Sequence, residues 1–220
     1  MNTEMKTAIV FGATGLVGSH LLTLLEQDSR YSHIKVFGRS KPQFTTDKVE
    51  FFLGDLRNPE RLAVQLTGDD LYICLGTTIK AAGSKPEFRR IDLDLPVKVA
   101  ELAKKNGVST IAVISSLGAN ATSRNFYLHT KGEMENLLIA QMFEKTVILR
   151  PSMLLGKRNE FRLGEEIGKR LFKALGFLLS GKWRRYRAVE AADVAAVMLK
   201  VTSEAGNGVT IVESEAIAEL

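Results

Sequence analysis

The feature that most constrains this chain is a glycine-rich segment directly after a short apolar run. Residues 7–11 read Thr-Ala-Ile-Val-Phe, and residues 12–18 read Gly-Ala-Thr-Gly-Leu-Val-Gly. Apolar residues then recur at helical spacing across residues 16–27, so the pattern predicts a strand, a tight turn and a helix. Such a turn lets backbone approach a dinucleotide's pyrophosphate, and the helix start offers it free N–H groups. We therefore expect dinucleotide binding here, the alternative being a purely structural glycine turn.

Short apolar runs alternate with longer helical patterns through most of the chain. The expected strands are Thr7–Phe11, Ile34–Phe37, Val49–Phe52, Leu71–Leu75, Thr110–Ser115 and Thr146–Leu149. The expected helices are Leu16–Gln27, Pro59–Leu66, Pro86–Asn106 and Tyr127–Gln141. Repeated β-α-β units whose strands are apolar at nearly every position predict an α/β fold, a Rossmann-type doubly wound parallel sheet.

The last 70 residues follow a looser pattern. We expect helices over 165–175 and 191–202, a turn region over 176–181, and a last strand over 208–212 at the sheet edge. A chain of 220 residues is long enough for one well-buried domain and short for two. The interpretation is a single domain, residues 1–220, in which residues 151–220 form a small substrate-side lobe.

Composition limits the classes of protein that fit. No apolar stretch approaches the roughly 18 residues of a membrane span, and the first apolar run is too short for a signal peptide. With a single cysteine, Cys74, the expected location is the reducing cytoplasm. The net charge of +5 is dispersed, which is typical of a solvated surface, so nucleic-acid binding is not expected. A basic and aromatic cluster at 182–187 is expected to rim the cleft; base stacking or lipid contact is the alternative.

The end of the second expected strand indicates which dinucleotide is bound. In nucleotide-binding sheets this position faces the adenosine ribose, where a carboxylate suits a free 2′-hydroxyl and an arginine suits a 2′-phosphate. Arg39 stands there, and Lys41 two residues later can add a second positive charge. The pair predicts NADP(H) rather than NAD(H), against the alternative of an ordinary surface arginine.

Two further strand ends carry candidate cofactor contacts. Asp55, followed by Leu56, can bind the adenine amino group or simply cap the next helix. After the fourth strand comes Leu75-Gly76-Thr77-Thr78, in which Gly76 allows close passage of the cofactor. The hydroxyls of Thr77 and Thr78 can reach ribose or phosphate oxygens.

The fifth strand and the next helix carry the candidate catalytic groups. Tyr127 and Lys131 are four residues apart, so they share one helix face. An ammonium beside a phenol favours the phenolate and can bind the nicotinamide ribose. Ser115 and Ser116 end the preceding strand, where one hydroxyl can polarise a substrate carbonyl while Tyr127 transfers the proton. The sequence contains no pattern that predicts a metal site.

Together these segments resemble the short-chain dehydrogenase/reductase superfamily, in its atypical branch. The sequence is similar to the HIV Tat-interacting-protein-like oxidoreductases and their bacterial relatives, often labelled putative nucleoside-diphosphate-sugar epimerases. The segments that carry the resemblance are FGATGLVGSHLL, CLGTTIKAAGS, SSLGANATSRNFYLHTKGEME, LRPSMLLGKR and the later Asp193-Val194-Ala195.

The resemblance implies a Rossmann-type fold with bound NADP(H) and assigns roles to individual residues. It implies pyrophosphate contacts from Gly12, Thr14, Gly15, Leu16, Val17 and Gly18. It implies nicotinamide contacts from Pro151, Ser152 and Met153, and a catalytic pair of Tyr127 and Lys131. Extended members place the catalytic hydroxyl at the second serine, Ser116, whereas Ser115 lies closer to the strand, so both remain candidates.

The expected function is an NADP(H)-dependent oxidoreductase that transfers hydride to or from a small carbonyl or alcohol. The alternative is an NADP(H)-binding redox sensor or regulatory interaction protein without turnover. The short segment after Pro151 leaves little room to grip a nucleoside diphosphate, which disfavours a sugar-nucleotide epimerase. Helix pairs that form dimers in many relatives are present, so a homodimer is one expected assembly.

Overall fold

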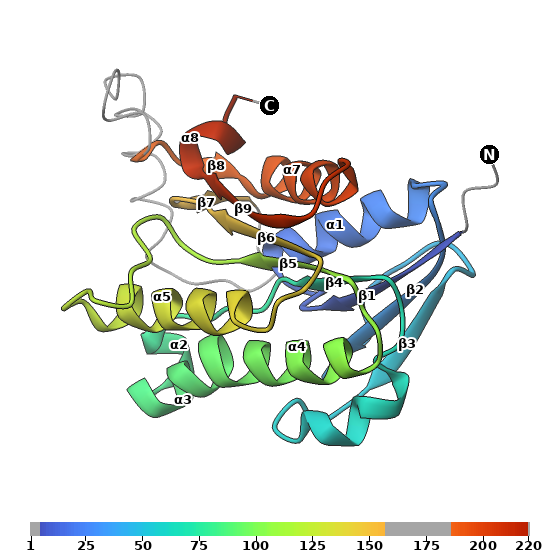
Figure 1. The fold of residues 1–220 in the computed structure, drawn as a ribbon, viewed down its shortest axis with the longest axis horizontal. Coiled ribbons are helices and arrows are strands. Elements are labelled where there is room, and N and C mark those ends of the chain that lie inside the picture. Colours follow the sequence, from blue (N-terminus) through green and yellow to red (C-terminus); the bar gives the residue numbers. More distant parts are fainter. Residues whose placement is uncertain (1–4, 157–185, 220) are drawn as a thin grey trace.

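A seven-stranded parallel sheet forms the centre of the protein (Figure 1). The computed structural model describes residues 5–156 and 186–219. The strands are β1 Lys6–Phe11, β2 Tyr31–Gly38, β3 Val49–Leu53, β4 Asp70–Ile73, β5 Thr110–Ile114, β6 Lys145–Arg150 and β9 Gly208–Glu213. Their order, β3-β2-β1-β4-β5-β6-β9, reverses beside β1 and confirms the predicted doubly wound Rossmann fold.

Helices cover both faces of this sheet, as Figure 1 shows. α1 Leu16–Gln27 and α7 Ala191–Ser203 pack together on one face, and α4 Leu95–Lys105 and α5 Phe126–Ile139 pack on the other. The residues of β1 from Ala8 to Phe11 are fully buried, because alternate side chains enter the two apolar cores. No helix within the described ranges is long and apolar enough to cross a bilayer.

Two of the expected helices differ from the prediction. Residues 59–65 form a 3₁₀ helix, η1, instead of an α-helix. The predicted single helix over 86–106 is divided into α3 Lys85–Arg89, a π-helical turn η2 Arg90–Asp94, and α4. Pro96 explains the division, since it has no N–H to donate to the carbonyl four residues earlier and its ring crowds that carbonyl.

The region after β4 also differs in detail. The strand ends at Ile73 and not at residue 75, so Cys74 and Leu75 already belong to the loop. A short helix, α2 Ile79–Ala82, follows this loop, in a segment where none of the expected helices lies. Thr78 caps it, because the Thr78 hydroxyl accepts the N–H of Ala81 at 3.1 Å.

The described part of the C-terminal region joins the main sheet. β9 pairs with β6, from Lys145 opposite Gly208 to Arg150 opposite Glu213, and α8 Ser214–Ile217 follows it. A second, two-stranded sheet joins β7 Leu154–Leu155 to β8 Val189–Glu190. Residues 157–185 lie outside the described part of the chain. This range includes the expected helix over 165–175, the expected turn over 176–181 and the first four residues of the basic and aromatic cluster.

A buried polar network ties the amino ends of three strands together. The carboxylate of Asp70, 1% exposed, lies 3.0 Å from Lys6 Nζ and accepts the Tyr31 hydroxyl at 2.6 Å. The Tyr31 and Tyr72 hydroxyls lie 2.8 Å apart. These groups are at the opposite end of the strands from the glycine turn, so the network holds the sheet together away from the candidate site.

Candidate functional site

Two adjoining cavities lie at the carboxyl ends of the central strands. One has a volume of about 490 Å³ and the other about 720 Å³. Both are lined by Gly15, Leu16 and residues 74–78, so they form one cleft that passes the glycine turn. Ligands of open α/β sheets bind at this edge, where the strand order reverses.

The glycine turn brings backbone close to the cleft because side chains are excluded from it. Gly12 has φ +85°, and a Cβ there would lie 2.6 Å from the carbonyl oxygen of Cys74. The Gly15 N–H donates to the Gly12 carbonyl at 2.9 Å, which closes the turn. Thr14 and Gly15 line the cleft here, and Leu16 and Val17 line it at the start of α1.

The first turn of α1 is open to an anion. Gly15 is its N-cap, no side chain of the described residues caps it, and it contains no acidic residue. Uncapped N–H groups at the positive end of a helix fit a pyrophosphate. Gly18 lines neither cavity; a Cβ there would lie 2.1 Å from the Gly12 carbonyl oxygen. Gly18 therefore allows α1 to pack closely against the turn and does not itself face the cavity where phosphate is expected.

The larger cavity holds the predicted adenosine-side residues. Arg39 and Asp55 line it together with Leu56. Arg39 is exposed and has no ion pair with any residue that the structure describes. Lys41 lines neither cavity, and its Nζ lies 4.8 Å from the centroid of the Phe44 ring. The ammonium of Lys41, expected to add a second positive charge for the 2′-phosphate, thus lies over an aromatic ring.

Asp55 is already engaged with its own loop. One carboxylate oxygen accepts the Arg57 N–H at 3.0 Å and the other accepts the Asn58 side-chain amide at 2.9 Å. The Arg57 N–H and the Asn58 amide hold the pKa of this carboxyl below its usual range. Asp55 thus shapes the turn before η1 and also lines the cavity. It does not cap that helix, because the N-cap is Asn58 and no side chain of the described residues caps it.

The smaller cavity collects the predicted catalytic residues. Ser115, Ser116, Tyr127 and Lys131 all line it, together with residues 151–153. Tyr127 is half-buried and its ring packs on Phe88 with centroids 5.4 Å apart. The cavity therefore combines a tyrosine and a lysine of α5 with the two serines that directly follow β5.

The two serine hydroxyls differ in their surroundings. Ser115 is 5% exposed, and its Oγ is buried without a hydrogen-bond partner among the described residues. Ser116 is half-buried, and its Oγ is 3.5 Å from the Leu117 carbonyl, a long contact. Both serines line the cavity, but the Ser115 Oγ is screened from solvent, whereas Ser116 as a residue is half-buried.

The sequence interpretation missed Asp92, which also lines the smaller cavity. Its carboxylate is 1% exposed, lies 2.8 Å from Lys131 Nζ and accepts the Thr77 N–H at 2.9 Å. A signal was present in the sequence. Phe88, Asp92, Leu95 and Val99 follow helical spacing, so the aspartate interrupts an apolar face that is otherwise buried.

Lys131 is 3% exposed and is held in its charged form by its neighbours. Burial by itself lowers the pKa of this ammonium, but the charges of Asp92 and Tyr127 outweigh burial and raise the pKa above its ordinary value. Nζ also donates a long hydrogen bond of 3.5 Å to the Ile114 carbonyl. The lysine is therefore a fixed cation in the floor of the cleft.

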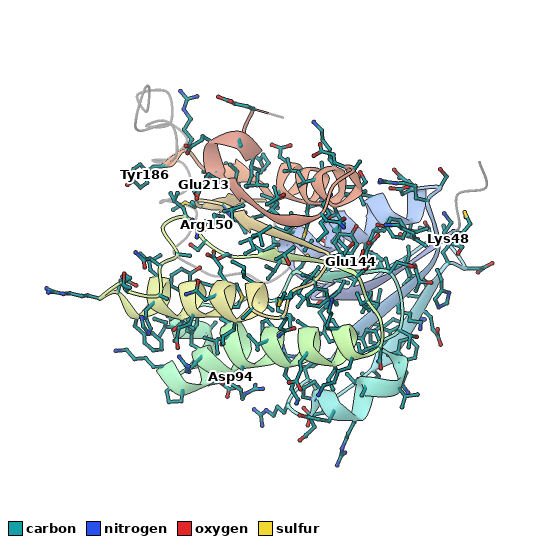
Figure 2. All side chains as sticks on the ribbon, viewed as in Figure 1. Lys48, Asp94, Glu144, Arg150, Tyr186 and Glu213 are labelled. Carbon is teal, nitrogen blue, oxygen red and sulfur yellow. The ribbon has the colours of Figure 1, made fainter. Side chains whose placement is uncertain are left out.

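An ion-pair network fixes the strand end that leads to residues 151–153. Arg150 donates to both carboxylate oxygens of Glu135, at 3.0 and 2.6 Å, and to Glu213 at 2.8 Å. Figure 2 shows Arg150 and Glu213 together at the ends of β6 and β9. The Pro151 carbonyl then accepts the Leu117 N–H at 2.9 Å. Backbone is thereby held against the cavity where the resemblance expects nicotinamide.

Cys74 lines both cavities, and burial raises the pKa of its thiol to about 12. Because the thiolate is the reactive form, alkylation of the folded protein at pH 8 should be roughly 10³-fold slower than that of a free cysteine. Denaturation in urea should restore the ordinary rate, and mass spectrometry of this single cysteine measures both. A fast reaction of the folded protein would show that the cleft stabilises the thiolate.

A model for a family described as NAD(P)H-binding matches residues 12–205. The chain belongs to this NAD(P)H-binding family. Within it, "Protein FMP52, mitochondrial" of Candida albicans is 32% identical over 209 residues, 92% of this chain and 90% of that protein. "Protein HTATIP2" of Rattus norvegicus is 32% identical over 222 residues, 99% of this chain and 90% of that protein. These relatives confirm the resemblance to the atypical short-chain dehydrogenases/reductases.

Solved structures confirm the fold. WbmH of Bordetella bronchiseptica, solved with NAD⁺, superposes with a TM-score of 0.73 at 16% identity, covering 96% of this chain and 76% of that chain. MoeE5, solved with UDP-glucose and NAD, superposes with a TM-score of 0.70 at 19% identity, covering 94% of this chain and 76% of that chain.

The FMP52 relatives are named as mitochondrial proteins. For this chain, a cytoplasmic location and a homodimer stay predictions.

Proposed function

We propose that this NAD(P)H-binding protein is an oxidoreductase that transfers hydride to or from a small carbonyl or alcohol substrate, with NADP(H) as its cofactor. The observation that carries the proposal is one shared cavity. Tyr127, Lys131 and Ser116 line the same space as the glycine turn and Pro151, so a cofactor anchored at the turn reaches the tyrosine. Bound nicotinamide would supply or accept the hydride.

The residues of the chain divide the remaining work. The Tyr127 hydroxyl donates or accepts the proton at the substrate oxygen, and Lys131 holds a positive charge beside it. Ser116 polarises the same oxygen by a hydrogen bond. We assign this role to Ser116 because the Ser115 Oγ is screened from solvent, whereas Ser116 is half-buried at the cleft surface.

The guanidinium of Arg39, which forms no ion pair with the described residues, supports NADP(H) as the cofactor. It lines the larger cavity after β2, where a 2′-phosphate can accept its paired N–H groups. The solved neighbours WbmH and MoeE5 bind NAD, which is the competing expectation. A charge-assisted hydrogen bond contributes about 1.5–3 kcal/mol, enough to decide between the two cofactors.

Arg39→Ala should therefore weaken NADPH binding by roughly 10- to 150-fold and leave NADH binding nearly unchanged. Fluorescence titration of the reduced nicotinamide measures both dissociation constants. Lys41→Ala is the matched control, because Lys41 lies over Phe44 and lines neither cavity. Equal losses for NADPH and NADH in Arg39→Ala would contradict the assignment.

Turnover distinguishes the enzyme from the alternative, a redox sensor without turnover. The purified protein should consume NADPH with at least one member of a panel of small aldehydes, ketones and quinones, followed at 340 nm. A protein that binds NADPH tightly, consumes none with any of these carbonyls, and binds a partner differently with NADPH and NADP⁺ would instead be a sensor.

A further inference from the structure

The most deeply buried charges in the cleft belong to a pair of residues from different elements. Asp92 lies in the π-helical turn η2, and Lys131 lies on α5. Their side chains are 1% and 3% exposed, and Lys131 Nζ lies 2.8 Å from Asp92 Oδ1. Two charges so far from solvent are stable only when each compensates the other.

Asp92 also contacts the loop after β4 through its second oxygen. Oδ2 accepts the Thr77 N–H at 2.9 Å, and residues 74–78 line both cavities. One carboxylate thus contacts the cation on α5 with one oxygen and the cofactor-facing loop with the other. We propose that Asp92 is a positioning residue, which fixes the Lys131 ammonium in the cleft and couples it to that loop.

The role requires two acceptor oxygens and a negative charge. An asparagine has the same size but only one acceptor oxygen, so either Lys131 or the Thr77 N–H would face an NH₂ group. The other acidic groups near Lys131 are the phenol of Tyr127 and the carboxylate of Glu135, both on α5. Glu135 is itself neutralised by Arg150 of β6. β5 contributes the uncharged carbonyl of Ile114. Among the residues that the structure describes, no other unpaired carboxylate near Lys131 could therefore replace Asp92.

The first test uses stability and needs no substrate. In the wild type, the raised pKa of Lys131 means that its contribution is complete at neutral pH and is lost only as the pH rises through that pKa. In Asp92→Asn, burial lowers the pKa of Lys131 below that of an unfolded lysine, so the unfolded chain binds more protons. The variant should therefore gain stability from pH 6 to pH 9, by up to about tenfold in the unfolding equilibrium constant per pH unit.

Urea unfolding of four proteins separates the pair from a general defect. Asp92→Asn should be the least stable at pH 6, and Asp92→Asn with Lys131→Met should recover stability and lose the pH dependence. Asp70→Asn is the matched control, because Asp70 is equally buried and pairs with Lys6 at the other end of the strands. An Asp92→Asn protein with the wild-type pH dependence would overturn the proposal.

The second test measures the coupling to the cleft. The NADPH dissociation constant of Asp92→Asn should rise with pH between 6 and 9, by about tenfold per unit above the new pKa, whereas Asp70→Asn should follow the wild type. If the oxidoreductase proposed above is correct, kcat falls with pH over the same range. This kinetic arm rests on the proposed function. A wild type that reduces no carbonyl contradicts that function only, while pH-independent NADPH binding by Asp92→Asn contradicts the coupling.

Discussion

Replacing Tyr127 with phenylalanine is expected to lower kcat by roughly 10²–10⁴-fold, the usual contribution of a positioned acid or base. The substitution removes one hydroxyl from the cavity and keeps the ring that packs on Phe88 at 5.4 Å. NADPH affinity and the melting temperature should stay close to the wild-type values. The rate of NADPH consumption with an accepted carbonyl, at saturating cofactor, measures the effect.

Tyr31→Phe provides the matched control for the loss of a phenolic hydroxyl. Tyr31 lies in the buried network at the amino ends of the strands, where its hydroxyl donates to Asp70 at 2.6 Å. Its removal should lower stability and leave kcat per folded molecule unchanged. A Tyr127→Phe protein that reduces the same carbonyl as fast as the wild type would exclude Tyr127 as the proton donor.

Gly18→Ala is expected to weaken NADPH binding by roughly 5- to 150-fold and to destabilise the protein. The new Cβ would lie 2.1 Å from the Gly12 carbonyl oxygen and 2.8 Å from its carbon, both backbone atoms that cannot rotate away. Overpacking of this kind costs about 1–3 kcal/mol. The turn can relieve the clash by moving away from α1. NADPH binding must then restore the native geometry of the turn, and the free energy that this costs raises the dissociation constant.

The sign of the stability change makes Gly18→Ala decisive. Alanine is better than glycine in a helix by about 0.8–1.0 kcal/mol, so a substitution without a clash would stabilise α1. Ser19→Ala, at the next and exposed position of α1, is the control and should leave NADPH binding intact. A Gly18→Ala protein that is both more stable and equally tight for NADPH would show that α1 can move without disturbing the turn.

The sequence was sufficient where local pattern and tertiary structure agree. The apolar run from Ala8 to Phe11 and the glycines after it predicted a buried parallel strand and a tight turn, because burial on both faces leaves no polar side of the strand. The Tyr127 and Lys131 pair was also readable, since a helix places residues four apart on one face. Their place just after the strand that ends at the serines added the expectation that they lie near Ser116, and all three line one cavity.

What the sequence could not supply depends on contacts between distant segments. Asp92 comes to Lys131 only because η2 widens the helix before Pro96 and α5 packs beside it. Lys41 resembles a phosphate ligand by position, yet the ring of Phe44 offers it a nearer partner. The partner that a side chain contacts depends on residues distant in the sequence, so the spacing of residues along the chain does not predict it.

The sheet order has a consequence for how the protein reaches its native state. All six strand pairs of the main sheet are parallel, so no pair can form from a hairpin. The last, β6 with β9, joins Arg150 to Glu213 across 63 positions of the chain. Loop closure must precede the gain from each pairing, which makes such topologies slow to fold. The cleft draws on residues 12 to 156 and is therefore expected to appear late in refolding, so that recovery of NADPH binding lags behind recovery of helix.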